Sequence, residues 1–164
     1  MIAMDQLQKL ADSDEIDTVI VADTDMQGRL YGKRLTVRHF LKAGKAGVNT
    51  CSVVLGWGQD HSLDAGYGFT GWDTGYPDFV SIPDLSTLRL CAWHPRTAIV
   101  LANAATLDGA AITVSPRAIL RRMLDRVRKS GLIPYTASEL EFFLLQETSH
   151  TTFAKGFVNL ETKH

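Results

Sequence analysis

Short stretches with regular apolar spacing alternate with polar turns in the first part of the chain. Residues 4–13 place apolar side chains at helical spacing, which predicts a short amphipathic helix. Residues 16–22, IDTVIVA, are β-branched and apolar and predict a buried strand. The turn DMQG follows at residues 25–28, where the Asp can bond to its own backbone and the Gly can take a positive φ. Residues 29–36 are then expected to be the return strand of a hairpin.

The pattern after the hairpin predicts a mostly antiparallel or mixed sheet with few helices. Residues 37–46 are expected to form a short helix that stops at Gly44 or Gly47. Further strands are predicted at residues 51–55, 79–82, 87–93 and 97–102. Residues 103–114 have the composition of a connector.

The strongest helix signal begins at Ser115-Pro116, where Ser can cap the helix and Pro suits its first position. Gly131 is a natural terminator. The apolar positions predict a buried stripe made of Ile119, Leu120, Met123, Leu124 and Val127. Residues 133–146 follow as a predicted strand, and the polar tail from Glu147 is expected to be poorly ordered.

Residues 56–77 are rich in glycine and aromatic residues and have no apolar period, which is typical of a lid or a binding loop. This stretch contains a G-x-G-x-x-G pattern at residues 66–71. Dinucleotide binding requires that pattern between a strand and a helix, and neither element flanks it here. The stretch also carries Asp64 and Asp73, with Asp78 just beyond it, and these acids suit either a cationic ligand or simple turns.

Composition narrows the class of protein. The chain has 164 residues, 45% of them hydrophobic, with 17 Lys plus Arg against 18 Asp plus Glu. This balance excludes a disordered or fibrous chain and offers no electrostatic reason to expect nucleic acid or a membrane surface as a partner. Two cysteines exclude a disulfide framework, and Cys91 with His94 is better explained by a buried thiol than by a zinc site. We therefore expect a soluble cytoplasmic protein.

Charged residues cluster at two places near the end of the chain. Glu139 and Glu141 would share one face of a strand, about 7 Å apart, close enough to serve one hard divalent cation. A solvated acidic strand face explains the same pattern. The basic residues of the helix after Ser115, among them Arg117 and Arg121, fit either phosphate binding or a solvated helix face.

Five segments in order resemble the N-terminal region of glutamine synthetase and its γ-glutamyl-amine ligase relatives. These segments are Asp25–Arg34, Thr74–Asp78, Pro83–Arg89, Ser115–Arg117 with Leu120, and Glu139–Phe143. Some positions depart from the family pattern: Tyr31 replaces a frequent Arg, Ala92 a usual Pro, and Asn103 a usual Asp. None of these departures falls on an expected metal ligand.

The resemblance implies an α+β fold with two parts. Residues 1–110 would form a β-grasp-like N-terminal domain, and residues 111–164 would contain the first helix and strand of a catalytic domain. It further implies a ligase that joins ammonia or an amine to the γ-carboxylate of glutamate through a γ-glutamyl phosphate made from ATP. Such an enzyme belongs to nitrogen metabolism and works as a homo-oligomer.

The resemblance also assigns roles to individual residues. Glu139 and Glu141 would help to hold the paired Mg²⁺ or Mn²⁺ ions. Asp78 through its motif, and Asp64 by position, would belong to an acidic loop that reaches the active site of a neighbouring subunit and attracts ammonium. Apart from the resemblance, the aromatic residues of the glycine-rich stretch, Trp57, Tyr67, Phe69 and Trp72, are candidates to enclose an organic amine.

Members of this family are several hundred residues long. The other metal ligands and the ATP pocket are therefore expected beyond residue 164, and the chain is expected to be an N-terminal fragment that is inactive and binds ATP and metal weakly or not at all. The predicted strand at residues 133–146 should pair with another copy or dock on the first domain. A non-catalytic β-grasp module for assembly or regulation is the alternative.

Overall fold

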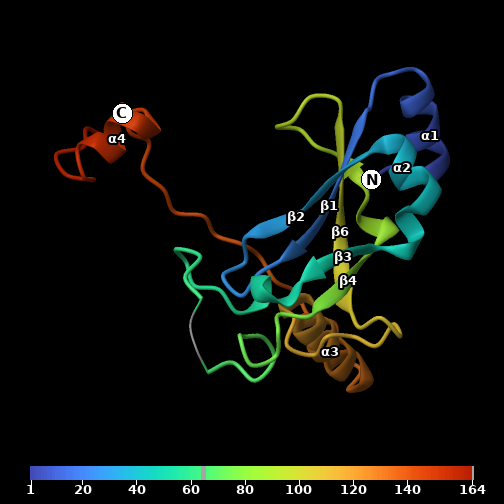
Figure 1. Ribbon diagram of the computed structural model, residues 1–164. Helices are drawn as coiled ribbons and strands as arrows, with labels where there is room; N and C mark the ends of the chain where they lie inside the picture. The colour runs from blue at the N-terminus through green and yellow to red at the C-terminus, as the bar shows by residue number, and fades with distance from the viewer. Residues whose placement is uncertain (64–65, 164) are drawn as a thin grey trace. The chain divides into compact units, whose positions relative to one another are not determined.

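A computed structural model describes residues 1–63 and 66–163 (Figure 1). It divides into two compact units, Met1–Gly131 and Leu132–His164. The first unit contains the β-sheet, and the second contains the acidic segment with Glu139 and Glu141. The predicted domain boundary between residues 110 and 111 stays a prediction.

The predicted hairpin is present. Strand β1 (Thr18–Thr24) pairs antiparallel with β2 (Leu30–Thr36) in a register that runs from Thr18 opposite Thr36 to Thr24 opposite Leu30. Gly28 has a φ of 81° in the connecting turn, a value that glycine adopts without strain. The length and geometry of this turn fix the register of the hairpin.

The sheet is mixed, as predicted. In the described part of the chain its order is β2-β1-β6-β4-β3, with β5 also paired to β6. The added strands are β3 (Val48–Cys51), β4 (Asp78–Pro83), β5 (Arg89–Leu90) and β6 (Thr97–Ala105). Strand β6 runs parallel to β1 and antiparallel to β4 and β5. Together with its helices this makes an α+β fold, whereas the β-grasp-like label stays a prediction.

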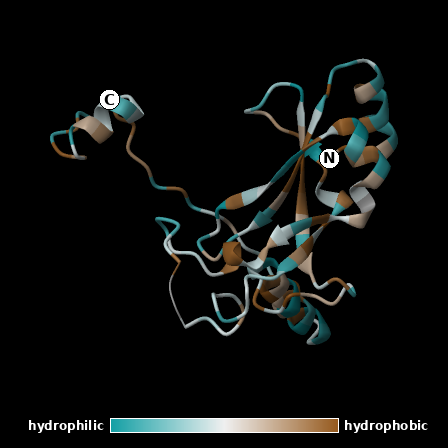
Figure 2. Ribbon diagram, viewed as in Figure 1, coloured by the Kyte–Doolittle hydropathy of each residue, from teal (hydrophilic) through white to brown (hydrophobic). Residues whose placement is uncertain are grey.

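Helices α1 (Met4–Asp12) and α2 (Val37–Ala43) pack against one face of this sheet (Figure 1). Leu7 from α1 and Phe40 from α2 are fully buried against Val19 of β1 and Val100 of β6. Figure 2 shows hydrophobic residues along β6 in the middle of the sheet. The amphipathic helix predicted at residues 4–13 is therefore present, and its apolar face packs against the sheet.

A second core cluster lies around Phe79, Val54, Leu55, Ala104 and Ile112. The prediction of a strand at residues 51–55 is wrong for most of this stretch, because Ser52–Leu55 is a 3₁₀ helix. Ser52, Val54 and Leu55 are all buried, and strict alternation would place Val54 and Leu55 on opposite faces of a strand. The tight turn brings both onto the same core.

One further strand is shorter than predicted. Only Arg89–Leu90 of residues 87–93 forms a strand, since Thr87 ends the 3₁₀ helix Leu85–Thr87 and Leu88 is the cap that follows it. The Asp84 carboxylate caps that turn by accepting from the backbone N–H of Ser86 at 3.2 Å. The third 3₁₀ helix, Gly44–Ala46, extends α2 as far as the predicted stop.

Helix α3 (Pro116–Lys129) is present where predicted, with Ser115 at its N-cap, although that side chain makes no capping hydrogen bond. Gly131, with a φ of 74°, follows its C-terminus. The predicted buried stripe is wrong, because Leu120 is 57% exposed and no residue of α3 is buried among those described. Ile119, Leu124 and Val127 are half-buried, so the described first unit covers that face of the helix only in part.

The second unit corrects two predictions. Among the described residues, no strand forms over residues 133–146; an isolated bridge joins Leu145 to Thr162. A strand needs a continuous row of hydrogen bonds to a neighbouring strand. In the described chain this segment has backbone bonds to another segment only around that bridge, from the Lys163 N–H to Leu144 and from the Gln146 N–H to Glu161. The tail is also more ordered than predicted, since α4 (Ser149–Ala154) begins with a capping box between Thr148 and Thr151.

Candidate functional site

The turn between β1 and β2 is built on the carboxylate of Asp25, which is 1% exposed. Its Oδ1 accepts from the backbone N–H groups of Gln27 at 3.0 Å and Arg29 at 2.9 Å. Its Oδ2 accepts from Arg29 Nε at 2.7 Å and from Trp57 Nε1 at 3.2 Å. The local backbone bonds are those the turn motif predicts, while the bond from Trp57 crosses to a distant segment.

The same turn holds the beginning of the glycine- and aromatic-rich stretch. The Arg29 guanidinium donates to the carbonyl oxygens of Gln59 at 2.7 Å and Gly58 at 3.2 Å. Burial alone would raise the pKa of Asp25, but hydrogen bonds from Arg29 and Trp57 hold that pKa below its ordinary value. The carboxylate is therefore charged and acts as a fixed clamp for the loop. Asp25, Arg29 and Trp57 are called the turn clamp below.

A cavity of about 380 Å³ adjoins the turn clamp. Its wall includes Met26, Leu55, Trp57, Tyr67, Phe69 and Val114. Three of the four aromatic candidates from the sequence therefore meet at one cavity. The fourth, Trp72, is 83% exposed and packs edge-to-face on Tyr76 with ring centroids 5.3 Å apart.

A polar junction connects α3 to the sheet. Arg117 forms an ion pair with Asp84, and its Nε donates to Asn103 Oδ1 at 2.9 Å. Arg121 Nη1 donates to the same oxygen at 3.0 Å. Hydrogen bonds from Ser86 and then Arg117 hold the pKa of Asp84 below its ordinary range. Of the two readings of this basic face, the solvated one holds at Arg121, which stays exposed, whereas Arg117 is half-buried in its contacts with the sheet.

A buried pair of polar residues lies across the hairpin. Asp23 and Tyr31 are direct partners in the β1–β2 register. Among the described residues, Asp23 Oδ2 and Tyr31 Oη are buried atoms without a hydrogen-bond partner. Burial raises the pKa of Asp23, against an opposing hydrogen bond from Ser81 and the charge of Arg117. Burial and the nearby charges of Asp23 and Asp25 raise the pKa of Tyr31 as well.

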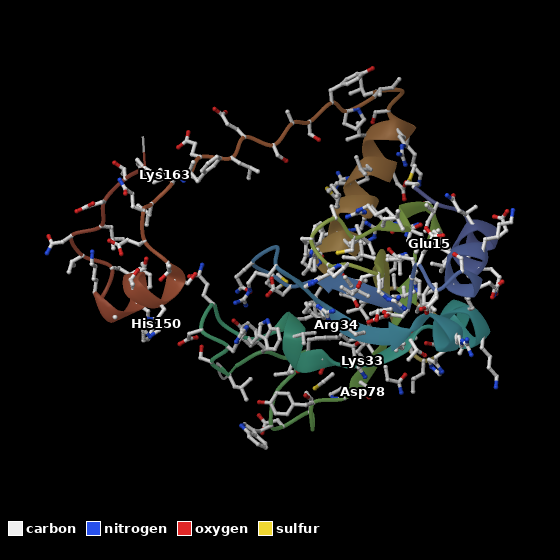
Figure 3. The ribbon with its side chains drawn as sticks, turned by 90° about the horizontal axis from the view of Figure 1, so that it is seen from above. Glu15, Lys33, Arg34, Asp78, His150 and Lys163 are labelled. Atoms are coloured by element: carbon white, nitrogen blue, oxygen red, sulfur yellow. The ribbon has the colours of Figure 1, made fainter. Side chains whose placement is uncertain are left out.

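The predicted site residues lie apart in the chain. Asp64 lies outside the described residues. Asp78 is exposed and begins β4 opposite Cys51 (Figure 3). Glu139 and Glu141 are exposed in the second unit, on a segment that belongs to no helix or strand. Their roles stay predictions.

The donor set for a divalent ion is incomplete in the described chain. Those residues contain no group of three or more His, Cys, Asp or Glu side chains that could hold a metal. Mg²⁺ prefers about six oxygen ligands in near-octahedral geometry. Two exposed carboxylates without a sheet to orient them do not supply that geometry, so the residues present do not fit a complete metal site.

Sequence reasoning missed the turn clamp and the junction at Asp84. Asp25 is recognisable as a turn residue, but nothing near Trp57 in the sequence indicates that its indole reaches that carboxylate. The ion pair between Asp84 and Arg117 joins two of the segments that carry the family resemblance. Asp84 belongs to one family motif and Arg117 to another, and this is the sequence signal that could have suggested their ion pair.

Comparison with known proteins places the chain in a family. Residues 113–164 match the family model described as glutamine synthetase, catalytic domain. The chain is 41% identical over 135 residues to a glutamate–isopropylamine ligase of a Pseudomonas species, covering 81% of this chain and 29% of that protein. It is 38% identical over 148 residues to a γ-glutamylethanolamide synthetase of Streptomyces coelicolor, covering 90% of this chain and 32% of that protein. The chain belongs to the glutamine synthetase family, and it spans about a third of the length of these relatives.

Solved structures support the same fold. A glutamine synthase homologue superposes with a TM-score of 0.60 at 19% identity, covering 70% of this chain and 27% of that one. A GmaS complex with ADP gives a TM-score of 0.55 at 14% identity, covering 91% of this chain and 35% of that one. Within the described residues, no helix has the length and apolar character to cross a membrane.

Proposed function

We propose that this chain is the N-terminal part of an ATP-dependent ligase that joins ammonia or an amine to the γ-carboxylate of glutamate. The main support is its 41% identity to a glutamate–isopropylamine ligase over 81% of the chain. Five family motifs in the expected order agree with this reading. The reaction would proceed through a γ-glutamyl phosphate, with glutamate, the amine and ATP as substrates.

In this proposal the two parts of the chain have separate tasks. The first unit supplies Asp78, and by position Asp64, to an acceptor site where a carboxylate attracts an ammonium group. Glu139 and Glu141 supply two of the ligands for Mg²⁺ or Mn²⁺, and the other ligands have to come from outside the described residues. The family model begins at residue 113, which supports a catalytic part that starts near residue 111.

An activity assay tests the proposal. ADP release that depends on both glutamate and an amine is measured for the 164-residue chain and for a longer polypeptide that contains it. We expect activity only in the longer polypeptide. An inactive longer polypeptide contradicts the ligase assignment, whereas an active 164-residue chain contradicts the expected inactivity of this chain.

A metal titration tests the two glutamates. In the longer polypeptide, Glu139→Ala and Glu141→Ala should each weaken Mn²⁺ binding by about tenfold or more. Glu161→Ala is the matched control, because it removes an acidic side chain from the same unit. Equal Mn²⁺ affinities in all three variants would exclude Glu139 and Glu141 as ligands.

Assembly is a second candidate function, favoured by exposed apolar side chains. Leu140, Phe142 and Phe143 are exposed in the second unit, and Leu120 is exposed on α3. Exposed apolar side chains of this kind favour pairing with another copy. Light scattering over a wide concentration range should reveal homo-oligomers, and a strict monomer would count against this function.

A further inference from the structure

The cavity beside the turn clamp has the size of a small-molecule site. Its volume of about 380 Å³ lies within the range of roughly 300–1,000 Å³ that is common for such sites. Among the described residues that line it, none has a charged side chain. Met26 and Tyr67 are half-exposed, so the cavity is open to solvent. These features suit a small ligand with an apolar part.

Three polar side chains of the wall, those of Thr70, Trp57 and Gln27, are already engaged. Thr70 Oγ1 shares a hydrogen bond with Ser52 Oγ at 2.8 Å, and Trp57 Nε1 donates to Asp25. Gln27 Nε2 donates to the carbonyl oxygen of Trp57 at 3.4 Å. Water inside the cavity would therefore find few strong partners, and displacing it by an apolar group is favourable.

The aromatic wall is held in place before any ligand arrives. Asp25 fixes the Trp57 indole from one side, and Tyr31 packs edge-to-face on it with ring centroids 6.1 Å apart. A wall that is already ordered lowers the entropic cost of binding. Asp25 is thus a positioning residue for this cavity.

We propose that the cavity receives the hydrocarbon part of an alkylamine acceptor, with Trp57, Tyr67 and Phe69 as the residues that determine its size. This inference rests on the proposed ligase function and names the acceptor class as alkylamines over ammonia. The amine nitrogen stays at the mouth, because the wall has no charged side chain to pair with an ammonium group. The apolar carbons enter and contact the aromatic rings.

Gly68 offers a direct way to fill the cavity. It lines the cavity, and a Cβ built on it meets no atom within 4 Å. Gly68→Leu therefore adds an apolar side chain at the wall without a backbone clash. Gly71→Leu is the matched control, because Gly71 lies outside this cavity and its Cβ would make only an ordinary contact, at 3.8 Å to Tyr67 O.

Binding is measured on the 164-residue chain by NMR of its tryptophan indole N–H signals, with Trp57→Phe used to assign the Trp57 signal. Isopropylammonium chloride should shift that signal and ammonium chloride at the same concentration should not. Gly68→Leu should abolish the shift and Gly71→Leu should keep it. Equal shifts with both salts, or a shift that survives Gly68→Leu, would overturn the inference.

Specificity is measured in the longer polypeptide as kcat/KM for isopropylamine relative to ammonia. Gly68→Leu should lower that ratio by about tenfold, the effect of losing one or two carbons' worth of apolar contact. If Gly68→Leu fails to fold, Phe69→Ala serves instead, and it should raise the ratio for a bulkier amine. An active ligase with unchanged ratios overturns the cavity inference alone. Absence of any ligase activity overturns the proposed function, while the NMR shift still decides whether the cavity binds alkylamines.

Discussion

Similar apolar sequences are buried in the first unit of the chain and exposed in the second. In the first unit, Val19 and Val21 of β1 and Val100 of β6 are fully buried in the core that α1 and α2 cover. In the second unit, the segment ELEFFLL is no less apolar, yet Phe143 is 84% exposed. β-propensity measures fit to a pleated, half-buried surface, so it takes effect only where a neighbouring strand exists.

The same contrast separates the candidate sites. The turn clamp is fixed by four hydrogen bonds to one buried carboxylate. Glu139 and Glu141 stand on a segment with no sheet to orient them. A side chain can serve precise chemistry only when its own rotamer is locked by packing.

The largest expected effect is a loss of folding stability in the first unit, whose core is covered by helices. Phe40→Ala should lower the free energy of unfolding by about 3–5 kcal/mol, because it leaves a cavity in the core. Phe143→Ala in the exposed segment should change it by less than about 0.5 kcal/mol. Urea unfolding followed by circular dichroism measures both. Similar losses in the two variants would show that Phe143 is packed after all and would remove the contrast.

The turn clamp should come next. Asp25→Ala removes the acceptor of two backbone and two side-chain donors and should lower the free energy of unfolding by about 2 kcal/mol. It should also change the Trp57 fluorescence, because the indole loses its partner. Asp60→Ala, an exposed turn residue nearby, is the control. An unchanged Trp57 signal in Asp25→Ala would mean that the clamp does not hold the loop.

A smaller effect is expected at the junction of α3. Arg117→Ala breaks the half-buried ion pair with Asp84 and should cost about 1 kcal/mol. Arg128→Ala breaks a pair with Asp125 in which both side chains are two-thirds exposed, and it should cost close to nothing. Hydrogen exchange along α3 measures the difference. Equal protection in the two variants would argue against anchoring of the helix through Arg117.

The smallest expected effect is a pH dependence. Burial raises the pKa of Asp23 above its ordinary 3.8, so the folded state keeps this proton better than the unfolded state does. The contribution of Asp23 to stability is therefore complete at a pH below its pKa in the unfolded chain. It is lost as the pH rises through the pKa of Asp23 in the folded chain. Asp25 and Asp84, with lowered pKa values, act in the opposite direction.

Asp23→Asn isolates this contribution. The stability difference between the variant and the original chain should move in favour of the variant as pH rises from about 4 to 7. Urea midpoints at several pH values measure it. A difference that stays constant with pH would show that Asp23 titrates at its ordinary value.

Local chemistry made much of the first unit predictable. The Asx turn at Asp25, the hairpin and the amphipathic first helix each depend on neighbours within a few residues, and all three are present. Val53 and Val54 favour a strand at residues 51–55, whereas Ser52–Leu55 forms a 3₁₀ helix that buries both Val54 and Leu55. The burial of the α3 stripe depended on a covering surface that apolar spacing alone does not supply.

For the candidate site, the sequence allowed prediction of the residues involved but not of the contacts between them. Trp57, Tyr67 and Phe69 were recognisable as a group, but their meeting with Met26 and Val114 joins segments far apart in sequence. The pairing of Trp57 with Asp25 and of Arg117 with Asp84 likewise needed the fold. Asp78 and the two glutamates carry roles that the family resemblance predicts, and the activity assay and the Mn²⁺ titration test them.

The amino-acid sequence by itself determined the family, the turn chemistry and the type of most elements, because these depend on residue identity and short-range hydrogen bonding. Tertiary structure alone decided which apolar faces are covered, which carboxylates are buried and where the aromatic cavity opens. The physical reason is that burial, pKa and strand formation depend on what a segment contacts, and contacts between distant segments exist only in the folded chain.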